Sequence, residues 1–357
     1  MFFDCSPARA HAATVSGRTK RGASKHFTVD IHCHVETPEA SALVEGVPHA
    51  PEPGVKFANA ATREVNRKQQ ETIRAQITSV ETRLKIMDRS GIDIQAISTS
   101  PMQYYYWAEP DLAQEIVRLQ NEALAELCAQ HPKRLAGLGT VSLQHPDLAA
   151  EQLRTAVTKL GLRGIQISTS INGRELSDPS LAPVWRVLEE LQALCFIHPF
   201  GSSLGARANA YYLVNTIGQP LETTIALSHL IFSGVLDRHP GLKILAAHGG
   251  GYLPTYIGRS DRAYAVRPEA AVHTQCAPSA HLKRIWYDTV VYDPMSLRHL
   301  IDRVGMHQIV LGSDYPFDMG CYNVHELVAQ TPGLTEEERA AVLGRNAAAL
   351  IGWPLAE

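Results

Sequence analysis

The chain has 357 residues, of which 45% are hydrophobic and 19% are charged, and its net charge is -3 at pH 7. These values are typical of a globular protein, and the small net charge gives no electrostatic reason to expect binding to nucleic acid or to an anionic membrane. No apolar run approaches the roughly 20 residues that are needed to span a bilayer.

The N-terminal segment is basic and has no hydrophobic stretch. Five Arg or Lys residues precede residue 27, against one acidic residue, whereas a secretory signal has an apolar centre. We therefore expect residues 1–26 to be a disordered extension and residues 27–357 to form a single domain. The six cysteines contain no Cys-x-x-Cys pair, which predicts neither a disulfide framework nor a thiolate zinc site and fits the reducing cytoplasm.

Strands and helices alternate along the rest of the chain. The expected strands are 27–34, 92–98, 135–143, 164–168, 194–198, 242–248, 285–291 and 308–314, and the expected helices are 81–90, 111–130, 147–160, 181–192, 221–237, 294–304 and 336–351. Eight strands that alternate with helices predict a (β/α)₈ barrel of the TIM type. A doubly wound open sheet is the alternative, but no Gly-x-Gly-x-x-Gly follows an early strand. We interpret two segments between elements, about 36–78 and 199–220, as lid loops over the barrel mouth.

Histidines and a carboxylate stand at the ends of four predicted strands. His32 and His34 end the first strand, and because they are two residues apart they face the same side. His198 ends the fifth strand, His248 the sixth and Asp314 the eighth. The C-terminal strand ends of this barrel meet at one mouth, and imidazole and carboxylate groups are common metal ligands.

Taken alone, each of these residues could have a structural role and not bind metal. His198 precedes a proline, His248 precedes three glycines, and Asp314 is placed to cap a helix. The joint pattern favours a metal centre. The remaining histidines near predicted turns or within helices are interpreted as structural or surface residues: His131, His145, His229, His239, His299 and His325.

The same motifs resemble a known family. The run from Asp30 to His34, the Ile-His-Pro at His198, the His-Gly-Gly-Gly at His248 and the Gly-Ser-Asp-Tyr-Pro-Phe around Asp314 are similar to the amidohydrolase superfamily. Within it, they resemble the branch of aminocarboxymuconate-semialdehyde decarboxylase and related non-oxidative decarboxylases, and the likeness extends over nearly the whole chain from residue 29. The resemblance implies one metal ion held by His32, His34, His198 and Asp314, with His248 as the catalytic acid and base.

The fourth predicted strand bears on the number of metal ions. Binuclear relatives carry a bridging lysine at the end of this strand, whereas this chain has Gln166, Ile167 and Ser168 there. One divalent ion is therefore expected. A set of three nitrogens and one oxygen with an open position suits zinc, with manganese as the alternative.

The resemblance also suggests how a carboxylate substrate is held. Arg259 matches an arginine that the related decarboxylases use for this purpose, and Arg74 aligns loosely with a second one; a guanidinium binds carboxylate with two parallel hydrogen bonds. Tyr211 and Tyr212 are candidates for an aromatic wall over a planar substrate. Related enzymes imply a homodimer or larger homo-oligomer, in which Arg259 serves the neighbouring subunit's site. A solvated or packing role is the alternative for each of these side chains.

The expected activity is decarboxylation of a small aromatic or muconate-type acid, a lyase reaction of aromatic compound catabolism. Hydrolysis of a lactone, amide or exocyclic amine is the alternative, and hydration of a carboxylated dienol is a third chemistry for the same residues. A metal-binding barrel without catalysis is also considered, but structural zinc sites close their coordination with protein ligands. The identity of the substrate depends on the two predicted lid loops, which contain no readable motif.

Overall fold

The computed structural model describes residues 26–50, 56 and 58–355, so the predicted disorder of the N-terminal extension falls outside the described residues except at residue 26. Its centre is formed by parallel strands in two groups, with the order β1-β2-β3 and β10-β9-β8-β7-β4. The strands are β1 (Val29–Val35), β2 (Ile94–Thr99), β3 (Leu135–Leu138), β4 (Gly164–Ile167), β7 (Leu194–Ile197), β8 (Lys243–Ala246), β9 (Ile285–Asp288) and β10 (Ile309–Val310). A separate antiparallel pair, β5 (Ser170–Ile171) and β6 (Arg174–Glu175), lies outside this arrangement.

Backbone contacts connect the two groups of strands at both of their edges. A parallel bridge between Gly139 and Ile165 joins the end of β3 to β4. On the other side the Ile31 N–H donates to the Leu311 carbonyl at 2.9 Å, and the His34 N–H donates to the Tyr315 carbonyl at 2.7 Å. The eight strands are thus arranged as predicted for a (β/α)₈ barrel, with the residues after β10 pairing with β1.

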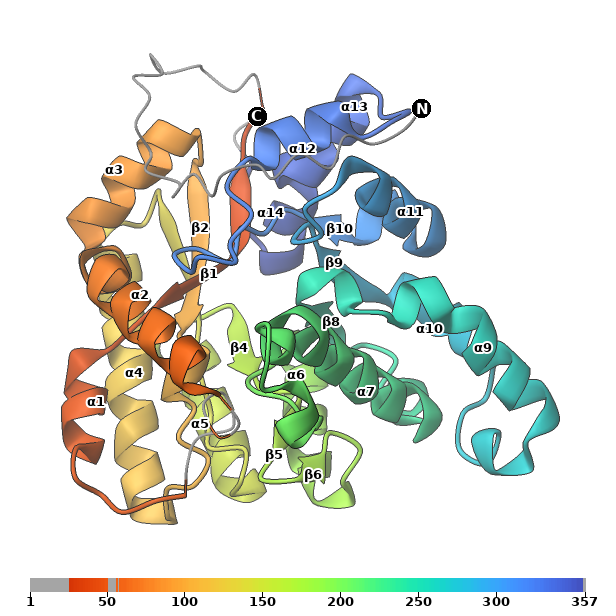
Figure 1. Cartoon of the computed structure of the whole chain (residues 1–357), viewed down its shortest axis with the longest axis horizontal. Coiled ribbons are helices and arrows are strands. Elements are labelled where there is room, and N and C mark those ends of the chain that lie inside the picture. Colours follow the sequence, from red (N-terminus) through yellow and green to blue (C-terminus); the bar gives the residue numbers. More distant parts are fainter. Residues whose placement is uncertain (1–25, 51–55, 57, 356–357) are drawn as a thin grey trace.

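Helices surround the strands (Figure 1). They are α1 (Pro38–Val44), α2 (Ala60–Thr78), α3 (Val80–Ser90), α4 (Pro110–Gln130), α5 (Pro146–Thr158), α6 (Ala182–Glu190), α7 (Gln219–Phe232), α8 (Val235–Arg238), α9 (Leu253–Val266), α10 (Pro278–His281), α11 (Pro294–Val304), α12 (Val324–Gln330), α13 (Glu336–Ala340) and α14 (Asn346–Ile351). Helix α9 and the chain that follows it extend beyond the other helices at the right of Figure 1.

The prediction of a lid loop over about 36–78 was wrong in part, because much of this segment is helical. Helix α1 lies within this stretch, and α2 occupies most of its second half. The side chain of Asn59 caps α2 by accepting the N–H of Thr62 at 2.8 Å, and Ile73 and Ile77 anchor its buried face. The second predicted lid, 199–220, contains only short helical turns before α7, at Gly205–Ala208 and Val214–Gly218.

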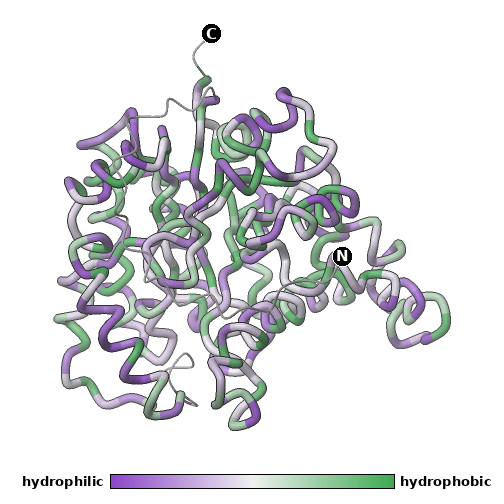
Figure 2. The backbone as a smooth tube through the Cα atoms, turned by 45° about the horizontal axis from the view of Figure 1, so that its top comes forward, coloured by the Kyte–Doolittle hydropathy of each residue, from purple (hydrophilic) through white to green (hydrophobic). Residues whose placement is uncertain are grey.

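The core is hydrophobic and lies mainly between the strands and the helices that cover them. Figure 2 shows hydrophilic and hydrophobic residues alternating along the outer helices, as expected for helices with one face against the core. β1 is buried along its whole length, including His32 and His34. In the described part of the chain, every helix is too short or too polar to cross a membrane.

Candidate metal centre

Three histidines and one aspartate meet beyond the C-terminal ends of the strands. His32 and His34 lie on β1 and face the same side, His198 directly follows β7, and Asp314 lies in the segment after β10. The backbone of Asp314 has a φ of 60°, and its N–H donates to the His32 carbonyl at 2.8 Å. This hydrogen bond fixes the aspartate against the strand that carries the first two histidines.

The four side chains point donor atoms at a common centre. Oδ1 of Asp314 lies 3.2 Å from Nε2 of His32, 3.2 Å from Nε2 of His34 and 3.9 Å from Nε2 of His198. All four residues are buried, and one donor atom from each lies within 4.8 Å of the others. These four atoms lack a hydrogen-bond partner within the described residues. Because buried polar atoms are normally paired, the arrangement fits a metal ion in their midst.

The opposite nitrogen of each imidazole has a partner of its own. Nδ1 of His32 lies 2.6 Å from Oδ2 of Asp288, and Nδ1 of His198 lies 2.9 Å from the Pro199 carbonyl. Nδ1 of His34 lies 3.4 Å from Oγ of Ser98, whose hydroxyl donates to Gln166 at 2.6 Å. These acceptors hold the proton on Nδ1 and leave the Nε2 lone pairs directed at the centre, as in metal-binding histidines.

Burial and charge determine the protonation of the cluster in the absence of metal. Burial lowers the pKa of His32, but the carboxylates of Asp314 and Asp288 outweigh it and raise that pKa to about 10. Burial lowers the pKa of His34 to about 4, and burial together with the neighbouring histidines lowers the pKa of His198 well below its usual value. Burial raises the pKa of Asp314, yet the charge on His32 holds it well below the usual range. The cluster therefore keeps a proton on His32, which a metal ion would replace.

His248 lies beside this cluster and not within it. It follows β8 with a φ of 55°, and its Nε2 is 3.5 Å from Oδ2 of Asp314. Its ring centroid is 5.1 Å from that of His198. Its Nδ1 is buried and has no hydrogen-bond partner among the described residues. The side chain is thus near enough to exchange a proton with a molecule bound at the centre, while another oxygen of Asp314 faces the metal position.

Asp288 is a functional candidate that the sequence analysis missed. Its Oδ2 contacts His32 and also accepts the His248 backbone N–H at 3.0 Å, while Oδ1 accepts the Gly249 N–H at 2.9 Å. One buried carboxylate therefore orients both a candidate metal ligand and the turn that carries His248. β9 ends at Asp288, so the same signal that identified Asp314, an acidic residue at a strand end, was present here. It was missed because the strand was predicted to continue to residue 291.

Two adjoining cavities open on the centre. Their volumes are about 800 Å³ and about 150 Å³, and both are lined by His248 and Asp314. The smaller one is also lined by His198 and by apolar or aromatic side chains, namely Met102, Phe200, Tyr212 and Phe317. Residues of α2 (Asn66, Gln69 and Gln70) close one side of it. The arrangement is suited to a small planar molecule that has one polar end at the metal position.

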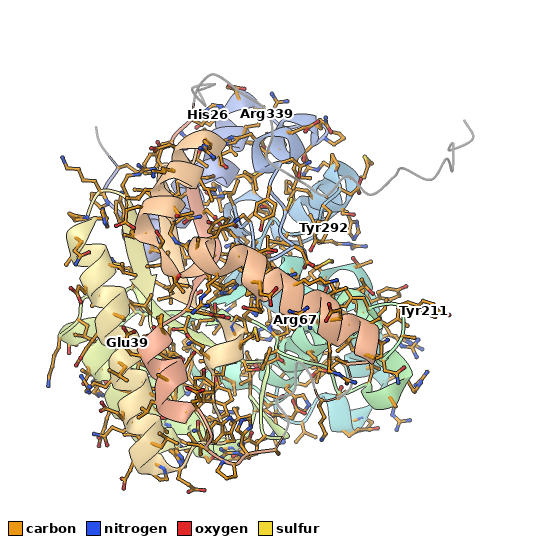
Figure 3. The ribbon with its side chains drawn as sticks, turned by 60° about the vertical axis from the view of Figure 1, so that its left-hand side comes forward. His26, Glu39, Arg67, Tyr211, Tyr292 and Arg339 are labelled. Atoms are coloured by element: carbon orange, nitrogen blue, oxygen red, sulfur yellow. The ribbon has the colours of Figure 1, made fainter. Side chains whose placement is uncertain are left out.

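The three residues predicted to bind substrate lie elsewhere in this chain. Arg74 on α2 and Arg259 on α9 are exposed, and Tyr211 is 90% exposed at the outer edge of the molecule (Figure 3). None of the three lines either cavity, and within the described part of the chain the side chains lining the two cavities include no Arg or Lys. Tyr212, the neighbour of Tyr211, does line the smaller cavity. The predicted metal ligands and His248 are thus brought together, and the predicted carboxylate anchors are not.

Comparison with known proteins gives consistent matches. A sequence model of the amidohydrolase family matches residues 29–353. The chain is 36% identical over 273 residues to 2-amino-3-carboxymuconate-6-semialdehyde decarboxylase of Dictyostelium discoideum, which covers 76% of each chain. This relative is close enough to establish common family membership.

Solved structures show the same fold. The 5-carboxyvanillate decarboxylase of Sphingomonas paucimobilis has a TM-score of 0.82 at 24% identity, covering 92% of this chain and 99% of that one. The dihydroxybenzoic acid decarboxylase of Polaromonas sp. JS666, solved with bound manganese and 2-nitroresorcinol, has a TM-score of 0.78 at 22% identity, covering 93% and 98%. Both structures carry the arrangement of strands and helices described above.

Proposed function

Because this chain belongs to the amidohydrolase family, we propose that His32, His34, His198 and Asp314 hold one metal ion for the decarboxylation of a small acid. The chain is a metal-dependent carboxy-lyase acting on an aromatic or muconate-type carboxylic acid, as its relatives are. The observation that carries the proposal is the set of four buried, unpaired donor atoms beside a histidine that is free to transfer a proton.

The donor set suggests the kind of ion. Three imidazole nitrogens and one carboxylate oxygen suit zinc, and we propose zinc, with manganese as the alternative because a structural neighbour binds it. When bound, the ion would supply positive charge that holds and polarises the substrate's oxygen atoms.

We assign the proton transfer to His248. The carbon that bears the carboxylate gains a proton from the His248 imidazolium, and the bond to the carboxylate then breaks. The electron pair of that bond returns to the π system of the substrate, CO₂ leaves, and His248 is left neutral. Asp314 supports this role by directing Oδ2 at His248 Nε2, 3.5 Å away, while its Oδ1 faces the metal position.

The walls of the cavity suit the substrate class. Phe317 and Tyr212 offer flat apolar surfaces to a ring, and Asn215 and Gln219 offer polar groups at the boundary of the two cavities. Asn66, Gln69 and Gln70 of α2 add polar groups to the wall of the smaller cavity. These features fit a planar acid with one polar edge.

We further propose a homodimer or larger homo-oligomer in which Arg259 acts on a neighbouring subunit's substrate. Among the described residues the two cavities are lined by no Arg or Lys, and Arg259 is exposed on the outer helix α9. A fully active monomer, measured by light scattering at assay concentrations, would overturn this proposal. Roles for Arg74 and Tyr211 in substrate binding stay predictions. We place the enzyme in the cytoplasm, since the five described cysteines are all free.

The test is CO₂ release over a panel of hydroxybenzoic and muconate-type acids. We expect release that stops after chelation and returns with added zinc or manganese. His198→Ala should bind less metal at the centre and lose activity in proportion. A change in ultraviolet absorbance without CO₂ would instead indicate hydrolysis or hydration, the two other reactions considered for this set of residues.

A further inference from the structure

A second cluster of metal-binding side chains lies away from the cavities. Asp237 belongs to α8, Cys276 precedes α10, and His281 is the last residue of α10. His281 comes before the first residue of β9, whereas Asp288 ends that strand at the catalytic side. The four residues of β9 span roughly 13 Å, so the two sites lie at opposite ends of the strand.

The donor atoms of the cluster surround one point. Nε2 of His281 lies 3.3 Å from Sγ of Cys276 and 3.6 Å from Oδ1 of Asp237, and all three donor atoms lie within 4.8 Å of one another. Zinc bonds of about 2.0 Å to nitrogen or oxygen and about 2.3 Å to sulfur place tetrahedral ligand atoms roughly 3.3–3.5 Å apart. The two separations from His281 Nε2 are close to these values.

The hydrogen bonds around the imidazole leave more lone pairs than protons. Oγ1 of Thr274 is also 3.2 Å from His281 Nε2, and its own proton goes to the Cys276 carbonyl at 3.2 Å. Oδ2 of Asp237 accepts the N–H of Gln275 at 3.1 Å, which leaves Oδ1 for the cluster. The single N–H of the fully buried His281 faces the oxygens of Thr274 and Asp237 and the sulfur of Cys276, and the Cys276 thiol brings one further proton. A cation at this point would satisfy all of them.

One neighbour acts against a cation. Nη1 of Arg284 lies 3.4 Å from Nδ1 of His281, and its other terminal nitrogen donates to the Leu236 carbonyl. A metal on Nε2 would move the imidazole proton to Nδ1, so Nη1 would have to turn away. The contact is at the long limit of a hydrogen bond, and the bond to Leu236 keeps the arginine anchored. The two negative ligands, Cys276 as thiolate and Asp237, offset the arginine's charge.

We propose that Asp237, Cys276 and His281 form a second metal site, selective for zinc, with solvent in the fourth position. The half-buried Cys276 gives access from outside. The site would join α8 to α10, which packs against α9, and so would fasten this extended part of the chain to the barrel. It is independent of the metal centre at the other end of β9, which contains no sulfur ligand.

Cobalt distinguishes the two sites because only the second one has a thiolate. Metal-stripped full-length protein titrated with Co²⁺ should develop a thiolate-to-cobalt charge-transfer band in the near ultraviolet. Cys276→Ser should lose that band and bind one zinc equivalent instead of two, and it should retain metal-dependent CO₂ release. Cys128→Ser, which alters another half-buried thiol, should behave as the unaltered protein. An unchanged band or zinc stoichiometry in Cys276→Ser would overturn the proposal.

A measurement on the unaltered protein avoids reliance on the folding of a variant. Alkylation of Cys276, followed by mass spectrometry of the peptide, should slow at least tenfold on addition of one to two equivalents of zinc. The alkylation rate of Cys128 should not change. Equal alkylation of Cys276 with and without zinc would show that the three side chains form only hydrogen bonds.

Discussion

At the scale of the residue, Asp314 connects the two halves of the proposed chemistry. Its two carboxylate oxygens face different partners, Oδ1 toward the metal position and Oδ2 toward His248. Asp314 and His248 both have a left-handed backbone, which is uncommon for residues other than glycine, although Asp and His adopt it more often than most. Such strained positions are retained where the surrounding structure enforces them, often at functional sites.

Replacing His248 separates its catalytic role from metal binding. We expect His248→Ala to keep its metal and to lose roughly 10²- to 10⁴-fold in kcat, the usual contribution of a general acid. Because the φ of 55° also costs alanine about 1 kcal/mol, His248→Asn serves as the matched variant that tolerates this backbone. Metal content and turnover are measured on the same preparation. Loss of metal in step with activity would make His248 a ligand.

Asp288 is expected to act through its neighbours and not on the substrate. Asp288→Asn removes the charge that orients His32 and can turn an N–H toward Nδ1, so we expect metal affinity to fall roughly 10- to 100-fold. Excess metal should restore much of the activity, which would not happen for a residue needed in the chemical step. Competition with a chromophoric chelator gives the affinity. An unchanged affinity would show that the backbone alone holds His32 in place.

At the scale of the element, the sequence predicted the strands well where each ended on a chemically distinctive residue. β1 carries His32 and His34, and β7 and β8 end shortly before His198 and His248. The two segments chosen as lids were less predictable, because α2 is a polar helix held by a cap at Asn59 and a few buried residues. Asp288 was missed because an apolar sequence alone does not show where a strand ends.

Close packing of β1, β9 and the segment after β10 gives an element-scale prediction. A Cβ at Gly312 would lie 2.8 Å from Cβ of His32 and 2.9 Å from Cβ of Asp288, which is closer than such atoms approach. We expect Gly312→Ala to cost about 1–3 kcal/mol in the free energy of unfolding and to weaken metal binding. Gly258→Ala on α9 is the control, since its Cβ meets nothing within 4 Å. Equal metal affinity in the two variants would contradict this account.

At the scale of the whole molecule, the alternation of strands and helices predicted the overall architecture, and the resemblance to decarboxylases predicted the class of reaction. The residues expected to bind the substrate carboxylate depend on surfaces that strand patterns do not place. Arg259 is on a helix that extends from the barrel, and Arg74 is on the outer part of α2. The structure of one chain places these arginines on its surface but does not say which residues of a neighbouring subunit they contact. The candidate metal ligands, by contrast, all lie in core strands or in the segments that follow them.

The same core cluster makes the stability of the metal-free protein depend on pH. His34 has a folded pKa of about 4 against an ordinary 6.5, so between these values only the unfolded chain binds the proton and stability falls as the pH falls. His32 has a folded pKa of about 10, so the stability it contributes is present below pH 6.5 and is lost as the pH rises toward 10. The melting temperature of chelated protein should therefore be highest near pH 6.5, where these two pH ranges meet.

Bound metal should change how stability depends on pH. Because it would replace the proton on His32, less stability should be lost as the pH rises above 6.5. We expect the melting temperature of loaded protein to stay nearly level on the alkaline side, where that of chelated protein declines. His32→Asn removes both the raised pKa and a ligand, so its chelated form should lose the alkaline decline and keep the acid one. Differential scanning calorimetry of the three samples between about pH 4 and about pH 10 tests this. A chelated protein whose melting temperature rises with pH above 7 would show that His32 is not the group that holds the proton.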